Sequence, residues 1–336
     1  MDPLTQGVLG AAAAQAVLAR RLGPRTWLFG ALGGMAADLD VLIRSSDDPM
    51  LALTFHRHFT HSLAFVPIGG LLCALPWLLR RAPDAEARAR RWAIAAATTI
   101  GYATHGLLDA FTSYGTQLWW PFSRTRVAWD FVAILDPIYT LLLLAGVWLS
   151  RRRRSPRPAL AALIASSAYL ALGGVLHARA LAAARGLAHD RGHALSRVEA
   201  FPVIPIDFVW RTVYRAGGRV YVDEARTPWF GATSTRSGES IPIAEVATLP
   251  TDVTADPRTR AAWETFVWFT DGWVGHDPAE PRHLVDLRYG LRTGGTESLW
   301  TLELRPGTAT PVRLDQRRPP PAEFFELRWR EILGED

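Results

Sequence analysis

Six long apolar segments in the first 177 residues of this chain limit what it can fold into. They cover residues 4–19, 26–43, 62–79, 92–111, 131–149 and 159–177. Several approach the roughly 20 apolar residues that a helix needs to cross a bilayer. From residue 195 onward polar and apolar residues alternate in short stretches, as in an ordinary globular protein. We therefore expect an α-helical polytopic membrane domain at 1–177, a connector at 178–200 and a soluble, β-rich α+β domain at 201–336.

The positive charges predict how these segments are oriented. All basic residues are arginines, and most inter-helix arginines follow the first, third and fifth segments: Arg20, Arg21, Arg25, Arg80, Arg81, Arg88, Arg90, Arg91, Arg151, Arg152, Arg153, Arg154 and Arg157. Because cytoplasmic loops carry an excess of arginine and lysine, we expect these loops in the cytoplasm. The 44–61 and 112–130 loops and the 201–336 domain then lie outside. This placement also favours a lipid bilayer over nucleic acid as the partner of the basic residues.

A dense polar cluster interrupts the apolar segments at His56-Arg57-His58-Phe59-Thr60-His61-Ser62. Three of the nine histidines lie here. Imidazole is a common metal ligand and proton carrier near neutral pH, and polar groups in apolar surroundings are usually retained for function. The structural alternative is a solvated loop between two helices.

Further polar residues fall at the same predicted membrane face. Asp38 and Asp40 end the second segment, His105 and Asp109 lie near the outer end of the fourth, and Asp130 and Asp136 begin the fifth. The His105–Asp109 spacing puts both side chains on one face of a helix. Structural alternatives are capping of neighbouring amides for Asp38 and Asp40, a hydrogen-bonded helix pair for His105 and Asp109, and an N-cap for Asp136, which precedes a proline.

These residue types predict a metal site of nitrogen and oxygen ligands. We expect His56, His61, His105 and Asp109 as core ligands. Asp38, Asp40, Asp130 and Asp136 are ligands or outer partners. The lone Cys73 lies in an apolar run, so the ligand set suits a divalent ion such as zinc or manganese. More than four ligands would accommodate two ions, an arrangement suited to phosphoester hydrolysis.

Several motifs resemble those of the YdjM/YbcI family. They are Met1-Asp-Pro-Leu-Thr-Gln-Gly-Val-Leu-Gly10, Asp38-Leu-Asp40, His56-Arg57 with Thr60-His61-Ser62, and His105-Gly-Leu-Leu-Asp109 with Phe111-Thr-Ser-Tyr-Gly-Thr116. The resemblance spans about 1–150, and segments 268–272 and 285–290 resemble the longer members. It implies a bacterial inner-membrane protein regarded as a metal-dependent hydrolase. Gln6 stands where the family pattern has His, and Ala37 where it has Pro.

Together these features predict metal-dependent hydrolysis of a lipid-like phosphoester by metal-activated water. Asp40 is the expected general base, and Arg57 would offset charge that builds up on the phosphate. Arg124 and Arg126 are expected to bind the phosphate of the substrate, and a plain outer-loop or interfacial role is the equal alternative. A metal-stabilised scaffold without catalysis is the main alternative. A metal or proton transporter is a third, although that would place ionisable groups deep in several helices.

The last third of the chain predicts strands and one helix. Phe208–Tyr214 and Arg219–Val222 around Gly217-Gly218 predict a hairpin. Segments 266–269, 283–289 and 298–304 predict further strands, and 322–333 predicts an amphipathic helix.

Overall fold

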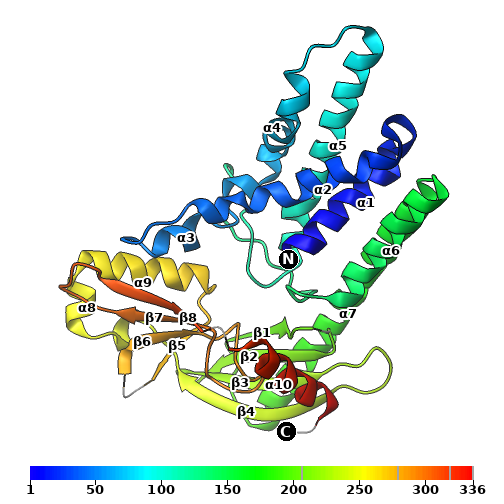
Figure 1. The fold of residues 1–336 in the computed structure, drawn as a ribbon. Coiled ribbons are helices and arrows are strands. Elements are labelled where there is room, and N and C mark those ends of the chain that lie inside the picture. Colours follow the sequence, from blue (N-terminus) through cyan, green and yellow to red (C-terminus); the bar gives the residue numbers. More distant parts are fainter. Residues whose placement is uncertain (206, 278–279, 318, 335–336) are drawn as a thin grey trace. The chain divides into compact units, whose positions relative to one another are not determined.

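The computed structural model describes residues 1–205, 207–277, 280–317 and 319–334. The chain divides into two compact units, coloured in chain order in Figure 1. The first unit comprises Met1–Leu42 and Phe55–Gly174, and the second comprises Ile43–Thr54 and Val175–Asp336. The first is helical and the second contains two antiparallel sheets, which confirms the expected order of a helical part followed by a β-rich part.

Each of the six apolar segments contains a helix. These are α1 (Pro3–Leu22), α2 (Thr26–Ala36), α4 (Val66–Leu78), α5 (Ala85–Ala110), α6 (Pro137–Arg153) and α7 (Arg157–Asp190). Local signals set where they start. Asp2, Asp84 and Asp136 each cap a helix by accepting a backbone N–H bond, which satisfies a donor that the first helical turn leaves unpaired. Short elements η1 (Gly23–Arg25), η2 (Ala37–Leu42), α3 (Met50–Phe55), η3 (Phe59–His61) and η4 (Leu63–Phe65) connect them.

Glycines allow α1, α2 and α5 to pack at very short range. A Cβ on Gly30 of α2 would lie 2.2 Å from the carbonyl oxygen of Gly10 on α1. A Cβ on Gly101 of α5 would lie 2.1 Å from the carbonyl oxygen of Gly30. The Gly30–Gly34 spacing therefore serves close helix approach. This packing brings the C-terminal end of α2 next to the last turns of α5.

One described helix, α7, is long and apolar enough to cross a membrane by itself. The segments Met50–His61 and Leu63–Leu78 pass the same test only as a pair, and they are bent by 56° relative to each other. α2 and α4 contain 11 and 13 residues, so they are shorter than the apolar segments that predict them.

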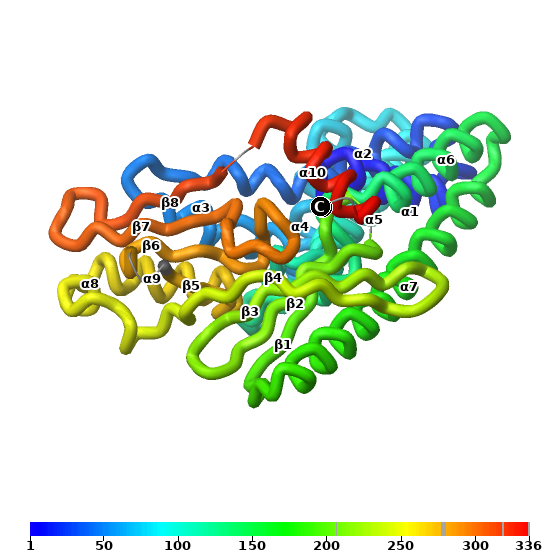
Figure 2. Tube along the Cα trace, turned by 90° about the horizontal axis from the view of Figure 1, so that it is seen from below, coloured from blue at the N-terminus to red at the C-terminus, as the bar shows by residue number. Residues whose placement is uncertain are grey.

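The second unit contains two four-stranded antiparallel sheets (Figure 2). The first runs in the order β1 (Arg197–Pro202), β2 (Val209–Ala216), β3 (Arg219–Arg226) and β4 (Ser234–Pro242). The second runs β5 (Val274–Asp277), β6 (Glu280–Asp286), β7 (Trp300–Leu304) and β8 (Val312–Gln316). This unit also contains helices α8 (Thr251–Ala255), α9 (Pro257–Phe269) and α10 (Pro321–Leu333), the short η5 (Val246–Thr248), most of α3 and the C-terminal part of α7.

The predicted hairpin is confirmed as β2 and β3. Gly217 and Gly218 both have positive φ, 56° and 73°, as the favoured two-residue hairpin turn requires. The strands expected at 283–289 and 298–304 overlap β6 and β7, and α10 confirms the C-terminal helix. The core of this unit forms around the fully buried Trp273, with Val213, Val222 and Leu287.

The strand expected at 266–269 is wrong, because this segment is the last turn of α9. Phe266 and Phe269 are both fully buried, and their spacing of three continues the helical face that Ala262 and Trp263 begin. Four apolar residues do not distinguish a strand from a buried helix turn. The deciding signal lies upstream, where Asp256 caps the helix and Pro257 occupies its first position.

Candidate metal centre

Three elements of the helical unit bring four side chains to one point. The short helix η2 carries Asp38, η3 carries His61, and the last turns of α5 carry His105 and Asp109. Gly106 lets η3 approach α5, because a Cβ there would lie 2.0 Å from the carbonyl oxygen of His61. Segments more than 60 residues apart in the sequence thus meet in the fold.

The facing atoms of these side chains form a compact group. His61 Nε2 lies 3.4 Å from Asp38 Oδ1 and 3.2 Å from Asp109 Oδ2. His105 Nε2 lies 3.3 Å from Asp38 Oδ1 and 3.4 Å from Asp109 Oδ2. All four atoms lie within 4.8 Å of one another. Ligands of a tetrahedral zinc ion at its usual bond lengths are separated by about 3.3 Å, so these distances suit such an ion.

Three of the four atoms have no hydrogen-bond partner among the described residues. His61 Nε2, His105 Nε2 and Asp109 Oδ2 are all buried and unsatisfied. An unsatisfied buried polar group is costly, yet these three point toward one another. A cation at their centre would satisfy all three at once. This donor set and spacing therefore fit a divalent metal ion.

The opposite edge of each imidazole is held by the protein. His105 Nδ1 lies 2.5 Å from the carbonyl oxygen of Gly34. Since a carbonyl only accepts, Nδ1 carries the hydrogen and Nε2 presents its lone pair to the centre. His61 Nδ1 lies 3.2 Å from Asp40 Oδ2. Such outer partners fix the tautomer and ring orientation of metal-binding histidines.

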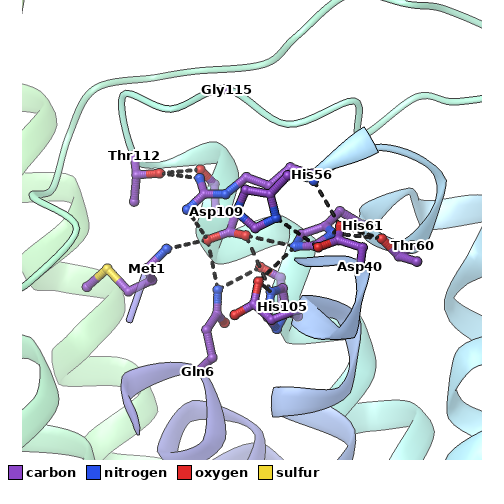
Figure 3. A network of polar contacts seen from close by, with 12 residues as sticks. Met1, Gln6, Asp40, His56, Thr60, His61, His105, Asp109, Thr112 and Gly115 are labelled. Atoms are coloured by element: carbon purple, nitrogen blue, oxygen red, sulfur yellow. Dashed lines mark hydrogen bonds and ion pairs between the residues drawn. The ribbon is translucent and has the colours of Figure 1, made fainter. Parts of the chain in front are cut away.

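The Oδ1 atom of Asp109 accepts hydrogen bonds while Oδ2 faces the centre (Figure 3). Gln6 Nε2 donates to Oδ1 at 2.9 Å, the amino group of Met1 at 2.5 Å, and Arg57 Nη2 lies 3.2 Å away. Gln6 and Arg57 are almost fully buried. These donors hold the carboxylate in one orientation. The guanidinium of Arg57 thus pairs with Asp109 through Nη2, while its Nη1 donates to the Thr112 hydroxyl.

Asp40 contacts several residues of the polar cluster 56–62. Its Oδ2 accepts from the Arg57 backbone N–H and the Thr60 hydroxyl, each at 2.9 Å, and its Oδ1 lies 2.8 Å from His56 Nδ1. The side chain of Asp40 is fully buried, and its two oxygens face the Nδ1 atoms of His56 and His61. Asp40 is therefore a carboxylate that positions two histidines.

A comparison with protein families matches residues 1–180, more than half of the chain, to the family described as YdjM inner membrane protein. The chain belongs to the YdjM family. This confirms the resemblance found in the motifs. No curated protein and no solved structure matches the chain. The matched region contains all four side chains of the YdjM centre.

Of the other residues expected at the YdjM site, His56 lies beside the four-atom group. It can form a second group with Asp38 and Asp40, and it is partly exposed. Asp136 instead caps α6 and accepts from the Tyr169 hydroxyl at 2.7 Å. Asp130 is buried with a positive φ of 59° and does not belong to the four-atom group.

The two arginines expected to bind substrate differ in exposure. Arg124 is exposed. Arg126 donates to the backbone carbonyls of Tyr114 and Gly115 and lies over the Tyr114 ring, 5.3 Å from its centroid. Arg57 lies over the same ring at 4.7 Å. Arg126 therefore helps to hold the 112–127 loop of the YdjM domain.

Sequence reasoning missed the part that Gln6 plays. The motif resemblance implies His at this position, whereas Gln6 has no imidazole and donates a hydrogen bond to Asp109. A signal existed in the sequence, because Gln6 is a polar residue inside an otherwise apolar segment. Its partner Asp109 is 103 residues away, so no local spacing could identify the pair.

Proposed function

We propose that this YdjM protein is a metal-dependent hydrolase of the inner membrane that acts on a lipid-like phosphoester. The observation that carries this proposal is the convergence of His61 Nε2, His105 Nε2 and Asp109 Oδ2, three buried atoms without hydrogen-bond partners among the described residues. Asp38 completes the donor set. Zinc and manganese suit these ligands. The proposal can be extended to two metal ions, with His56 and Asp40 as ligands of the second.

A multi-pass membrane position explains the apolar surface of the helical unit. Large apolar side chains are exposed along several helices: Leu28 and Leu32 on α2, Leu71, Leu72 and Leu75 on α4, Leu141, Leu144 and Trp148 on α6, and Leu160 and Ile164 on α7. Soluble monomers rarely expose so many. In our proposal the bilayer covers them, with the arginine-rich loops in the cytoplasm and the β-rich unit outside. Such a position suits a substrate that keeps its acyl chains in the bilayer.

When bound, a divalent ion lowers the pKa of a coordinated water and polarises a phosphoryl oxygen. The chain's own residues prepare this chemistry. Asp40 and Gly34 hold the two histidines, and the donors on Asp109 Oδ1 leave Oδ2 for the metal. His56 is the proton acceptor in our proposal, because only its Nδ1 takes part in the contact with Asp40 and its side chain is partly exposed. Arg124, exposed on the 112–130 loop, is the proposed contact for the phosphate.

The test is hydrolysis by purified, metal-loaded protein of a panel of phospholipids and lipid phosphates in mixed micelles. We expect phosphate or headgroup release by the wild type, and loss of at least about 10²-fold in the His56→Ala variant, as for removal of a general base. His189→Ala is the matched control, since this histidine lies at the end of α7 outside the cluster. A fully metal-loaded wild type that cleaves nothing in the panel would contradict the proposal.

One observation favours a second function, a metal-stabilised scaffold. Catalytic zinc sites keep one coordination position open, whereas structural sites are closed by four protein ligands. The side chains of His61 and His105 are fully buried and that of Asp109 is nearly so, whereas the side chain of Asp38 is 20% exposed. If Asp38→Asn abolishes metal binding, the four-ligand closed site is favoured. If the variant keeps metal, three ligands suffice and Asp38 occupies the position that substrate would take.

A further inference from the structure

An exposed aromatic pair projects from the β-rich unit where β3 connects to β4. Trp229 and Phe230 lie in this connection, and Phe230 is 89% exposed, among the most exposed large apolar side chains in the described part of the chain. Trp229 is 39% exposed. We call residues 228–231 the aromatic tip. Water is an unfavourable environment for such a pair, and Trp is typical of the interface between membrane and water.

The tip is tied to α7, the one described helix that is long and apolar enough to cross a membrane by itself. Arg179 of α7 donates from Nη1 to the carbonyl oxygen of Pro228 at 2.7 Å and from Nη2 to that of Gly231 at 2.8 Å. These carbonyls flank the two aromatic residues. One guanidinium therefore fixes both ends of the tip to the helix, and Figure 2 shows the C-terminal part of α7, which belongs to the same unit, beside the sheet that carries the tip.

The position of Arg179 along α7 sets the depth of the tip. The apolar stretch of this helix ends at about residue 177, and each helical residue adds about 1.5 Å. Arg179 is therefore about 3 Å beyond the end of the stretch. If α7 spans the bilayer, Arg179 lies at the level of the lipid headgroups, and so does the tip that it holds.

We infer that the aromatic tip of Trp229 and Phe230 docks into the bilayer interface at the end of α7. The occupant of this apolar surface is the lipid of the membrane that α7 crosses. The inference rests on the proposed span of α7, and it is independent of the metal centre. It gives the β-rich unit a second attachment to the membrane besides the chain itself, at a fixed height above the bilayer.

Spin labels at single cysteines in the full chain test this inference. Cys73→Ser removes the only cysteine, and Phe230→Cys, Ser167→Cys and Phe325→Cys then each carry the label. Phe325, 47% exposed on α10, is the matched control for an exposed aromatic that Arg179 does not hold. The protein is reconstituted in nanodiscs of phosphatidylethanolamine and phosphatidylglycerol, and the accessibility of each label to oxygen and to a water-soluble nickel complex is measured.

We expect oxygen to be preferred at 167 and at 230, and the nickel complex at 325. Arg179→Ala should lower the oxygen preference at 230 to that of 325 while leaving 167 unchanged. If the label at 230 prefers the nickel complex as the label at 325 does, while the label at 167 prefers oxygen, the docking of the tip is overturned and the span of α7 is not. A label at 167 that is exposed to the nickel complex overturns the span of α7 and the inference with it. An unchanged 230 label in Arg179→Ala overturns the role of this arginine.

Discussion

At the residue scale, the candidate metal ligands are held in place by side chains that are not ligands themselves. Gln6 Nε2 donates to Asp109 Oδ1, so its loss would leave this buried carboxylate less restrained. Outer partners of this kind typically contribute a factor of about 10–100 to metal affinity. We predict that Gln6→Ala weakens metal binding by this factor, measured by competition with a chelator of known affinity. Gln15→Ala, also buried on α1, is the control, and equal losses in both variants would assign the effect to packing of the helix.

Asp40 provides a second prediction at this scale. Asp40→Asn removes the charge that holds the Nδ1 atoms of His61 and His56. We predict about 10–100-fold weaker metal binding, as expected for an outer partner, together with slower hydrolysis at saturating metal. Asp47→Asn, in the exposed 45–49 loop, should leave both unchanged. Unaltered affinity with lost hydrolysis would instead assign Asp40 the role of general base.

The sequence predicts which types of ligand the metal centre contains better than it predicts which individual residues belong to it. His105 and Asp109 follow from their spacing of four on a helix, and His61 follows from the polar cluster. His56 is close in sequence to His61, yet it lies beside the group because Asp40 binds its Nδ1. The sequence predicts Asp136 as a ligand or outer partner of the site, whereas in the structure its side chain caps α6. Which ring nitrogen faces inward depends on contacts such as that of His105 with Gly34, 71 residues away.

At the element scale, the centre requires α1, α2 and α5 to remain in close contact. Gly30→Ala would place a methyl group 2.2 Å from the Gly10 carbonyl oxygen and 2.6 Å from Ala14 Cβ. Overpacking of this kind costs about 1–3 kcal/mol. We predict a lower Tm for Gly30→Ala together with weaker metal binding, measured by thermal unfolding in detergent.

Gly186→Ala is the matched control for this prediction. A Cβ there meets nothing within 4 Å, and Gly186 lies inside α7, where alanine is the better helix former by roughly 1 kcal/mol. Its Tm should stay the same or rise. If both variants lost stability equally, close approach of the helices would not be the cause.

Sequence patterns predict the elements of this fold unevenly. Each of the six apolar runs contains a helix, and the Gly217-Gly218 pair marks the turn of the β2–β3 hairpin. Helix ends are less predictable: α7 extends to Asp190, well past its apolar stretch. The helical turn at Phe266–Phe269 was missed, since four apolar residues fit either period. Burial by tertiary contacts decides such segments, and these contacts are not local in sequence.

At the scale of the whole molecule, the arginine distribution makes a prediction about topology. Reporter fusions at residues 85, 155 and 250 should report the cytoplasm for the first two and the outside for the third. Residue 85 begins α5 and residue 155 lies between α6 and α7. A cytoplasmic reporter at 250 would contradict an external β-rich unit, and with it an external substrate.

The central claim is that four side chains of the helical unit bind a metal ion, and the metal content of the purified protein tests it most directly. Elemental analysis of the full chain, purified without chelator, should find about one divalent ion per chain, or two if His56 and Asp40 bind a second. His61→Ala and Asp109→Ala should lose it while the β-rich unit stays folded, and His189→Ala should retain it. Wild-type protein without metal, or unchanged metal in both ligand variants, would contradict the account.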